Sequence, residues 1–172
     1  MNLVLIGYRA TGKTTVAKIV AGLLDIECKD ADVEIEARAG KTIAQIFAED
    51  GEPTFRDLES EVIVDLLQGD RLLLSAGGGA PMRPKNRRVM RENATVVLLT
   101  ASPETIVQRM AADAKTADQR PSLTGKGPLE EVQEVLSARA SAYLETAHQI
   151  VATDGKSPEE VAREVAGLVS VE

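Results

Sequence analysis

The 172-residue sequence has the length of one domain, and its 44% apolar content can supply one hydrophobic core. Aromatic residues make up only 2% and tryptophan is absent, which disfavours stacking on nucleic-acid bases. The formal net charge of −7 also disfavours nonspecific binding to nucleic acids or anionic membranes.

The first residues carry no targeting or membrane signal. Residues 1–7 are too short for a signal peptide, and no apolar run approaches the ~20 residues of a membrane-spanning helix. We therefore expect a cytoplasmic protein with no membrane partner. Separately, we expect a monomer. The single Cys28 cannot form an internal disulfide, and Cys28 and His148 alone form no zinc-type cluster, so structural roles are favoured for both.

Short apolar runs alternate with helical patterns along the chain. Residues 2–6 predict a strand that stops at Gly7, and apolar residues at helical spacing predict a helix after Lys13. Further strands are predicted at 72–74, 94–99 and 150–152, and helices at 54–68, 103–112, 129–146 and 158–169. This alternation is typical of an α/β fold in which helices cover both faces of a parallel sheet.

The segment between the first strand and the first helix matches the phosphate-binding pattern G-x4-G-K-[ST] with Gly7, Tyr8, Arg9, Ala10, Thr11, Gly12, Lys13 and Thr14. Its glycines let backbone N–H groups converge on a phosphate, Lys13 reaches the β- and γ-phosphates, and the Thr14 hydroxyl coordinates Mg²⁺. An ordinary glycine turn is the alternative. We assign ATP binding to Gly7, Ala10, Thr11, Gly12, Lys13, Thr14 and Thr15.

Two carboxylates follow a short apolar strand candidate. In an extended segment, Asp30 and Asp32 would lie on one face and could hold a metal and a hydroxyl substrate. Alternatively, Asp32 caps a helix that begins at Val33.

A glycine triplet, Gly77 to Gly79, follows the predicted strand at 72–74. Backbone amides there could approach a ligand closely, although a tight turn is the alternative.

In order and spacing, the chain's motifs resemble those of the shikimate kinase family. They are the phosphate loop, residues 30–36 (Asp-Ala-Asp-Val-Glu-Ile-Glu), Phe55-Arg56, the glycine triplet, Arg120-Pro121 and Arg139-x3-Tyr143. Many phosphotransferases share the phosphate loop, whereas the combination is specific to this family. The resemblance spans almost the whole chain.

The resemblance implies ATP-dependent phosphorylation of the shikimate 3-hydroxyl, which gives 3-phosphoshikimate and ADP in aromatic amino-acid biosynthesis. It also implies a single kinase domain over residues 1–172, with a five-stranded parallel sheet and three layers. Within it, the phosphate loop spans 7–14, a substrate-binding subdomain about 30–62 and a mobile lid about 113–126. Residues 113–128 are rich in glycine, proline and polar residues, which suits a lid.

The family's functional positions carry over to particular residues. Shikimate would contact Asp32, Arg56 and Arg139, with the Gly77, Gly78 and Gly79 backbone beside it. Asp30 matches an acidic position near the magnesium, and Arg109 matches the arginine that packs on adenine. The lid residue Arg120 would neutralise charge on the transferring phosphoryl group, so the implied catalytic residues are Lys13, Asp32 and Arg120.

Physical chemistry is consistent with these roles. Two guanidiniums can clamp the shikimate carboxylate while Asp32 accepts a hydrogen bond from the attacking hydroxyl. Each arginine taken alone could equally form a surface salt bridge. A related small-molecule kinase, such as a gluconate or nucleoside monophosphate kinase, is the nearest rival, and a noncatalytic nucleotide-binding regulator is a second.

Overall fold

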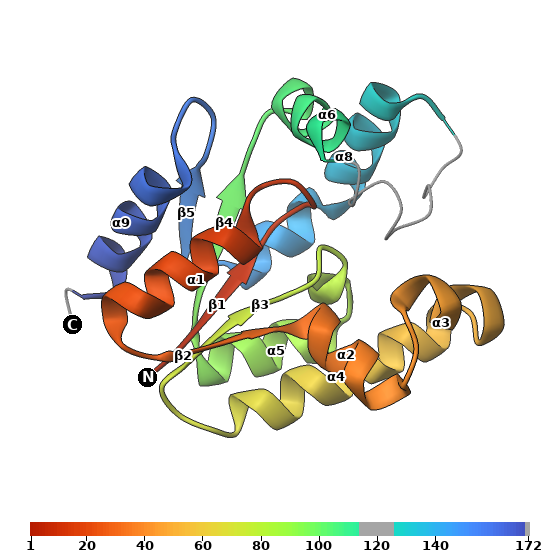
Figure 1. The fold of residues 1–172 in the computed structure, drawn as a ribbon, viewed down its shortest axis with the longest axis horizontal. Coiled ribbons are helices and arrows are strands. Elements are labelled where there is room, and N and C mark those ends of the chain that lie inside the picture. Colours follow the sequence, from red (N-terminus) through yellow and green to blue (C-terminus); the bar gives the residue numbers. More distant parts are fainter. Residues whose placement is uncertain (114–125, 171–172) are drawn as a thin grey trace.

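The computed structural model describes residues 1–113 and 126–170 (Figure 1). Most of the lid predicted at about 113–126, including Arg120, therefore lies outside the described residues. In the described residues, five parallel strands form one sheet in the order β2-β3-β1-β4-β5. The predicted α/β class and five-stranded parallel sheet are confirmed.

The strands and helices follow one another along the chain in βα order. The strands are β1 (Asn2–Ile6), β2 (Glu27–Asp30), β3 (Leu72–Ser75), β4 (Thr95–Thr100) and β5 (Gln149–Ala152). The helices are α1 (Lys13–Leu24), α2 (Ala31–Ala39), α3 (Ile43–Glu49), α4 (Glu52–Leu67), η1, a 3-10 turn (Ala80–Met82), α5 (Pro84–Asn93), α6 (Pro103–Ala112), α8 (Pro128–Thr146) and α9 (Pro158–Val169).

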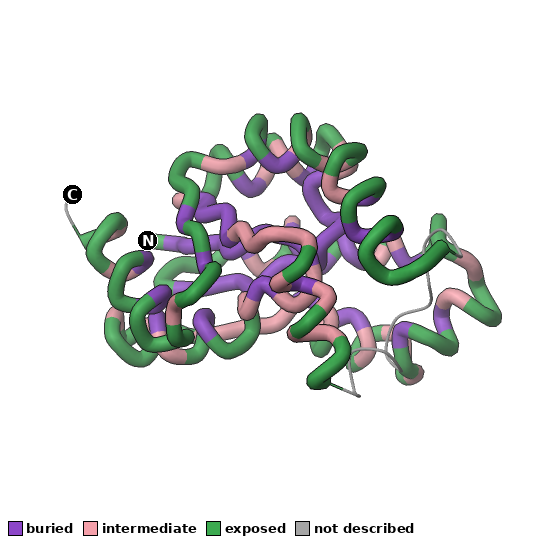
Figure 2. The backbone as a smooth tube through the Cα atoms, turned by 90° about the horizontal axis from the view of Figure 1, so that it is seen from above, coloured by how far each residue is buried: buried purple, intermediate pink, exposed green. Residues whose placement is uncertain are grey.

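Helices cover both faces of the sheet and bury its three central strands, β3, β1 and β4. Side chains of β1 alternate between the two faces, so Leu3 and Leu5 pack with α1 and α9, whereas Val4 and Ile6 pack with α2, α4, α5 and α8. Figure 2 shows the buried strands at the centre and exposed positions on the outer sides of the helices. The resulting three layers place the carboxyl ends of all strands at one edge of the sheet.

Capping residues explain why the sequence predicts the first residues of two helices correctly. Ser102 and Ser157 cap α6 and α9, and each is followed by proline at the first helical position, so both helices begin as predicted. Helices α3 and α5 were not predicted. The seven-residue α3 is too short for a clear periodicity, and only two residues of α5, Asn86 and Met90, are buried.

The single histidine lies where β5 begins. The His148 backbone N–H donates to the Val96 carbonyl at 2.8 Å, and the His148 Nδ1 accepts a hydrogen bond from the Val96 N–H at 3.0 Å. Partial desolvation and then the charge of Arg91 hold the pKa of His148 below its usual 6.5. These two hydrogen bonds support the structural role that the sequence predicts.

We expect the folded protein to lose stability as His148 becomes protonated. Because the folded-state pKa is lowered, the unfolded chain takes up the proton first, and the free energy of unfolding falls as the pH drops below about 6.5. Above that pH the contribution is constant. NMR titration of this histidine should give a pKa below that of a histidine peptide, and an equal or higher value would contradict the prediction.

No helix in residues 1–113 or 126–170 is long and apolar enough to cross a membrane.

Candidate active site

A cavity of about 250 Å³ lies at the carboxyl edge of the sheet, where the loops after β1, β2 and β3 meet. It contains most of the residues that the sequence predicts for the site: Ala10, Gly12, Lys13, Thr14, Thr15, Asp30, Asp32, Arg56, Gly77, Gly78 and Arg139. Four other predicted residues are not part of this lining: Gly7, Thr11, Gly79 and Arg109. The last one, Arg120, lies outside the described residues.

The phosphate loop requires glycine at its first position. Gly7 has φ +146°, and a Cβ added there would lie 2.4 Å from the Leu99 carbonyl oxygen, so any side chain would collide with β4. The Lys13 Nζ folds back over the loop and donates to the carbonyl oxygens of Gly7 at 2.7 Å and Tyr8 at 2.9 Å. Its ammonium group is therefore already directed into the curve of the loop.

Two further hydrogen bonds fix the shape of this loop. The Thr11 hydroxyl donates to the Tyr8 carbonyl at 2.7 Å, and Arg109 of α6 donates through Nη1 to the Ala10 carbonyl at 3.1 Å. Arg109 also donates to the Thr153 hydroxyl and carbonyl, at 3.0 and 3.1 Å. The Arg109 side chain thus joins the phosphate loop to the loop after β5, two segments that are far apart in the sequence.

Ala10 has a left-handed backbone, with φ +61°, which alanine adopts only at a cost of roughly 1–2 kcal/mol. The loop keeps its shape here in spite of the alanine.

The structure corrects the predicted geometry of the two aspartates. Asp30 ends β2 and is the N-cap of α2, and its Oδ1 accepts hydrogen bonds from the backbone N–H groups of Asp32 and Val33. The helix therefore starts at Ala31, and Asp32 lies in its first turn rather than in an extended segment or at the cap. Both carboxylates still line the cavity, because the turn between β2 and α2 replaces the predicted strand alternation.

The second carboxylate oxygen of Asp30 faces the phosphate loop. The Thr14 hydroxyl donates to the Asp30 Oδ2 at 3.0 Å. Hydroxyl and carboxylate oxygens are the ligands that Mg²⁺ prefers, and a magnesium site usually takes only one or two protein carboxylates because phosphates and waters complete it. The described residues contain no group of three or more potential metal-ligating side chains, and this pair fits the more open kind of site.

Arg56 of α4 is held by a buried carboxylate that the sequence analysis missed. Its Nη1 donates to the Glu59 Oε1 at 2.9 Å, and the Glu59 side chain is fully buried. The Arg56 guanidinium also lies 5.1 Å above the ring of Phe55. The spacing of three residues on a predicted helix was the available signal for the Arg56–Glu59 pair.

The glycine triplet lies against two arginines. A Cβ on Gly79 would lie 2.5 Å from both Nη atoms of Arg56, and a Cβ on Gly78 would lie 3.1 Å from the Arg139 Nη1. Neither glycine has a positive φ, so the close approach of the guanidiniums, not backbone conformation, disfavours larger residues there. Arg139 in turn lies 5.8 Å from the ring centre of the buried Tyr8.

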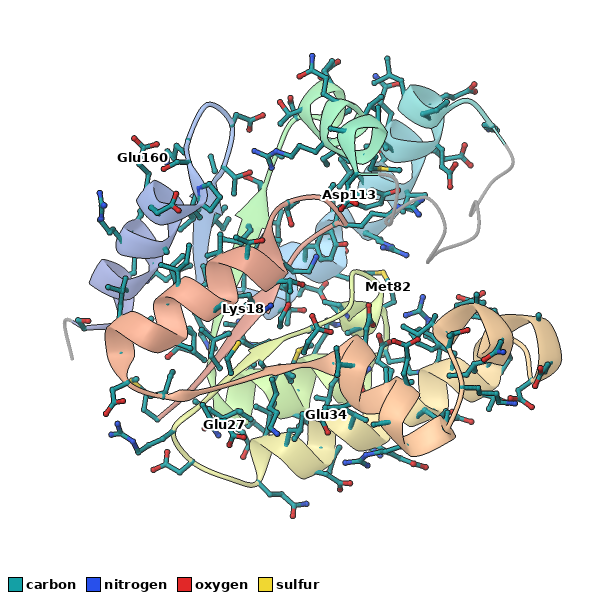
Figure 3. The ribbon with its side chains drawn as sticks, in the orientation of Figure 1. Lys18, Glu27, Glu34, Met82, Asp113 and Glu160 are labelled. Atoms are coloured by element: carbon teal, nitrogen blue, oxygen red, sulfur yellow. The ribbon has the colours of Figure 1, made fainter. Side chains whose placement is uncertain are left out.

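The remaining lining residues were not assigned a role in the site from the sequence. They are Tyr8, Arg9, Phe47, Ser75, Ala76 and Asp113. Figure 3 shows Asp113 at the end of α6, next to the loop that joins β1 to α1. Phe47 belongs to α3, which the sequence pattern did not reveal, and it packs on Phe55 with ring centres 4.9 Å apart.

The cavity thus combines a phosphate loop with the guanidiniums of Arg56 and Arg139 and the carboxylates of Asp30, Asp32 and Asp113 from other elements. A family model described as "Shikimate kinase" matches residues 9–169 of the chain. The chain belongs to the shikimate kinase family. The resemblance seen in the motifs is confirmed over nearly the whole sequence.

Individual members of the family agree with this assignment. A shikimate kinase of Rhodopirellula baltica is 42% identical over 142 residues, which cover 83% of this chain and 76% of the relative. The structure of an Acinetobacter baumannii shikimate kinase in complex with shikimate matches with a TM-score of 0.91 and 34% identity, over 98% of this chain and 92% of that one. A gluconokinase from Sinorhizobium meliloti, at a TM-score of 0.59 and 18% identity over 98% of this chain and 91% of that one, shares the fold alone.

Proposed function

We propose that this protein is a shikimate kinase that transfers the γ-phosphoryl group of ATP to the shikimate 3-hydroxyl, in aromatic amino-acid biosynthesis. The observation that carries the proposal is the shared cavity, in which Arg56, Arg139 and Asp32 lie with the phosphate loop. Two guanidiniums suit the single carboxylate of shikimate, and Asp32 suits a hydroxyl, whereas a nucleobase acceptor would not need this combination.

Positioning and charge neutralisation carry most of phosphoryl transfer. The Lys13 ammonium, now held by two loop carbonyls, would turn to the β- and γ-phosphates. Asp32 would accept the hydrogen bond of the attacking hydroxyl and align its oxygen with the γ-phosphorus. Arg56 and Arg139 would hold the carboxylate and so fix the orientation of the acceptor ring.

Magnesium is proposed at Thr14 and Asp30, where the hydroxyl and carboxylate oxygens already meet. When bound, it would neutralise charge on the β- and γ-phosphates. The hydrogen bond between these two side chains keeps them in place at the start of α1 and α2.

The roles of Arg109 and Arg120 come from the family resemblance. Arg109 lies between the phosphate loop and the loop after β5, a position suited to one wall of an adenine site. Arg120 would neutralise the transferring phosphoryl group from a lid over about 113–126, and a subdomain over about 30–62 would carry the acceptor. Closure of both would exclude water that competes for the phosphoryl group.

ADP release with ATP and Mg²⁺ tests the function directly, with shikimate, gluconate, AMP or no acceptor. Shikimate-dependent ADP is the expected result. Turnover with only another acceptor would overturn the substrate and keep the kinase fold, and no turnover with any acceptor would favour a noncatalytic regulator. The monomeric state and cytoplasmic location stay predictions of the sequence, and gel filtration tests the first.

Replacing Gly79 with alanine should weaken shikimate binding and also lower stability. The new Cβ would displace the Arg56 guanidinium from the position in which it donates to Glu59, while φ of −93° at this position suits alanine. We expect the KM for shikimate to rise about tenfold or more, which corresponds to about 1.4 kcal/mol, and the KM for ATP to stay the same. Steady-state kinetics check this, with Gly22→Ala in α1, where an added Cβ meets no atom within 4 Å, as the control.

A further inference from the structure

Tyr143 of α8 reaches across the molecule to the loop that follows β3. Its side chain is buried, with 4% of the residue exposed, and its hydroxyl donates a hydrogen bond to the Gly78 carbonyl oxygen at 2.7 Å. The two residues are 65 positions apart in the sequence. A phenylalanine would fill the same space but could not donate this hydrogen bond. The hydroxyl group is therefore what joins α8 to the glycine triplet.

The same face of α8 carries Arg139, one helical turn before Tyr143. Both side chains contact Gly78, because a Cβ on this glycine would lie 3.1 Å from the Arg139 Nη1. A Cβ on Gly78 would also lie 3.3 Å from the Gly7 carbonyl oxygen. The Gly78 backbone is therefore enclosed between α8 and the phosphate loop.

The hydrogen bond from Tyr143 sets the direction of one peptide plane. A peptide unit is planar and trans, so the Gly78 carbonyl and the Gly79 N–H point in opposite directions. With the carbonyl directed at Tyr143, the Gly79 N–H is directed away from α8. This peptide lies between the two guanidiniums, since Arg56 lies against Gly79 and Arg139 lies against Gly78.

We propose that Tyr143 is a positioning residue for the acid substrate, which orients the Gly78–Gly79 peptide between Arg56 and Arg139. The inference rests on the proposed function, since it assigns the carboxylate of shikimate to these two arginines. The turn that the Ala80 N–H closes on the Gly77 carbonyl at 3.1 Å leaves its middle peptide, Gly78–Gly79, two possible directions, and glycine tolerates both, so the Tyr143 hydrogen bond selects one of them. Without the hydroxyl, the buried Gly78 carbonyl would lose this partner, and the peptide would rotate toward another donor.

The effect should appear in binding rather than in the chemical step. The carboxylate is remote from the reacting hydroxyl, so its contacts are the same in the ground state and the transition state, and losing them raises KM without lowering kcat. A merely structural tyrosine would instead lower stability and disturb both substrates alike. The ratio of the two KM changes therefore separates the two roles.

The test is Tyr143→Phe, which removes one oxygen and keeps the ring. Thr146→Val is the matched control, because Thr146 is a fully buried residue of the same helix whose hydroxyl donates within α8, to the Ala142 carbonyl at 2.6 Å. Both variants lose one buried hydroxyl. Steady-state kinetics for each substrate and thermal unfolding are measured for both variants and for the unaltered protein.

We expect Y143F to raise the KM for shikimate about tenfold, with kcat and the KM for ATP within about twofold. T146V should leave all three constants unchanged, even where both variants unfold at a lower temperature. Unchanged shikimate KM in Y143F, or parallel changes for ATP and shikimate in both variants, would overturn the positioning role. Absence of shikimate-dependent turnover in the unaltered protein would instead overturn the proposed function.

Discussion

Asp32→Asn is expected to lower kcat for shikimate phosphorylation by about 10²–10⁴-fold, the usual contribution of a positioned acid–base group. The substitution keeps the size of the side chain and removes only the negative acceptor that would align the attacking hydroxyl. The proposed ATP site is the phosphate loop, which Asp32 does not belong to, so the affinity for ATP should change by no more than about twofold. Steady-state kinetics and calorimetric titration with ATP measure the two quantities.

Glu34→Gln provides the control for this substitution. Glu34 is also an acidic residue in the first turn of α2, but it does not line the cavity and pairs with Lys29 at 3.7 Å. Both changes remove one negative charge from the same helix N-terminus, which alters helix stability by about 0.3–1 kcal/mol. Comparable losses of kcat in the two variants, or an active D32N enzyme, would show that Asp32 does not orient the nucleophile.

Much of the fold could be predicted because its signals are local. The strands that end at Gly7 and before Gly77 are short apolar runs, and the helices after Ser102 and Ser157 carry a cap and a proline. A parallel order of such strands brings their carboxyl ends together. The position of the cavity therefore follows from the pattern, even before the order of the strands is known.

The parts that could not be predicted depend on tertiary packing. Either Asp30 or Asp32 satisfies the rule for a helix cap, and only the turn out of β2 selects Asp30. Glutamate is rarely buried, so composition gives no reason to place Glu59 beneath Arg56 with no exposed surface. The contact of Tyr143 with Gly78 joins segments 65 residues apart and leaves no local signal.

The buried ion pair of Arg56 and Glu59 should make Arg56 a stability determinant as well as a binding residue. Arg56→Leu removes the guanidinium that donates to the buried Glu59 Oε1 at 2.9 Å, and removal of one member of such a pair costs about 3–5 kcal/mol. The variant should also lose shikimate affinity, because one half of the proposed carboxylate clamp is gone. Urea unfolding and shikimate titration measure the two effects separately.

The double variant R56L/E59L separates stability from binding. Replacing both members of a buried pair with apolar residues is often neutral or stabilising, so the double variant should recover most of the lost free energy of unfolding and none of the shikimate affinity. Arg38→Leu is the control, since its 2.7 Å pair with Asp65 is partly exposed and should be worth about 0–1 kcal/mol. If R56L loses no more stability than R38L, the buried carboxylate does not depend on Arg56. If the double variant regains shikimate affinity, Arg56 does not bind the substrate carboxylate, and Arg139 must hold it alone.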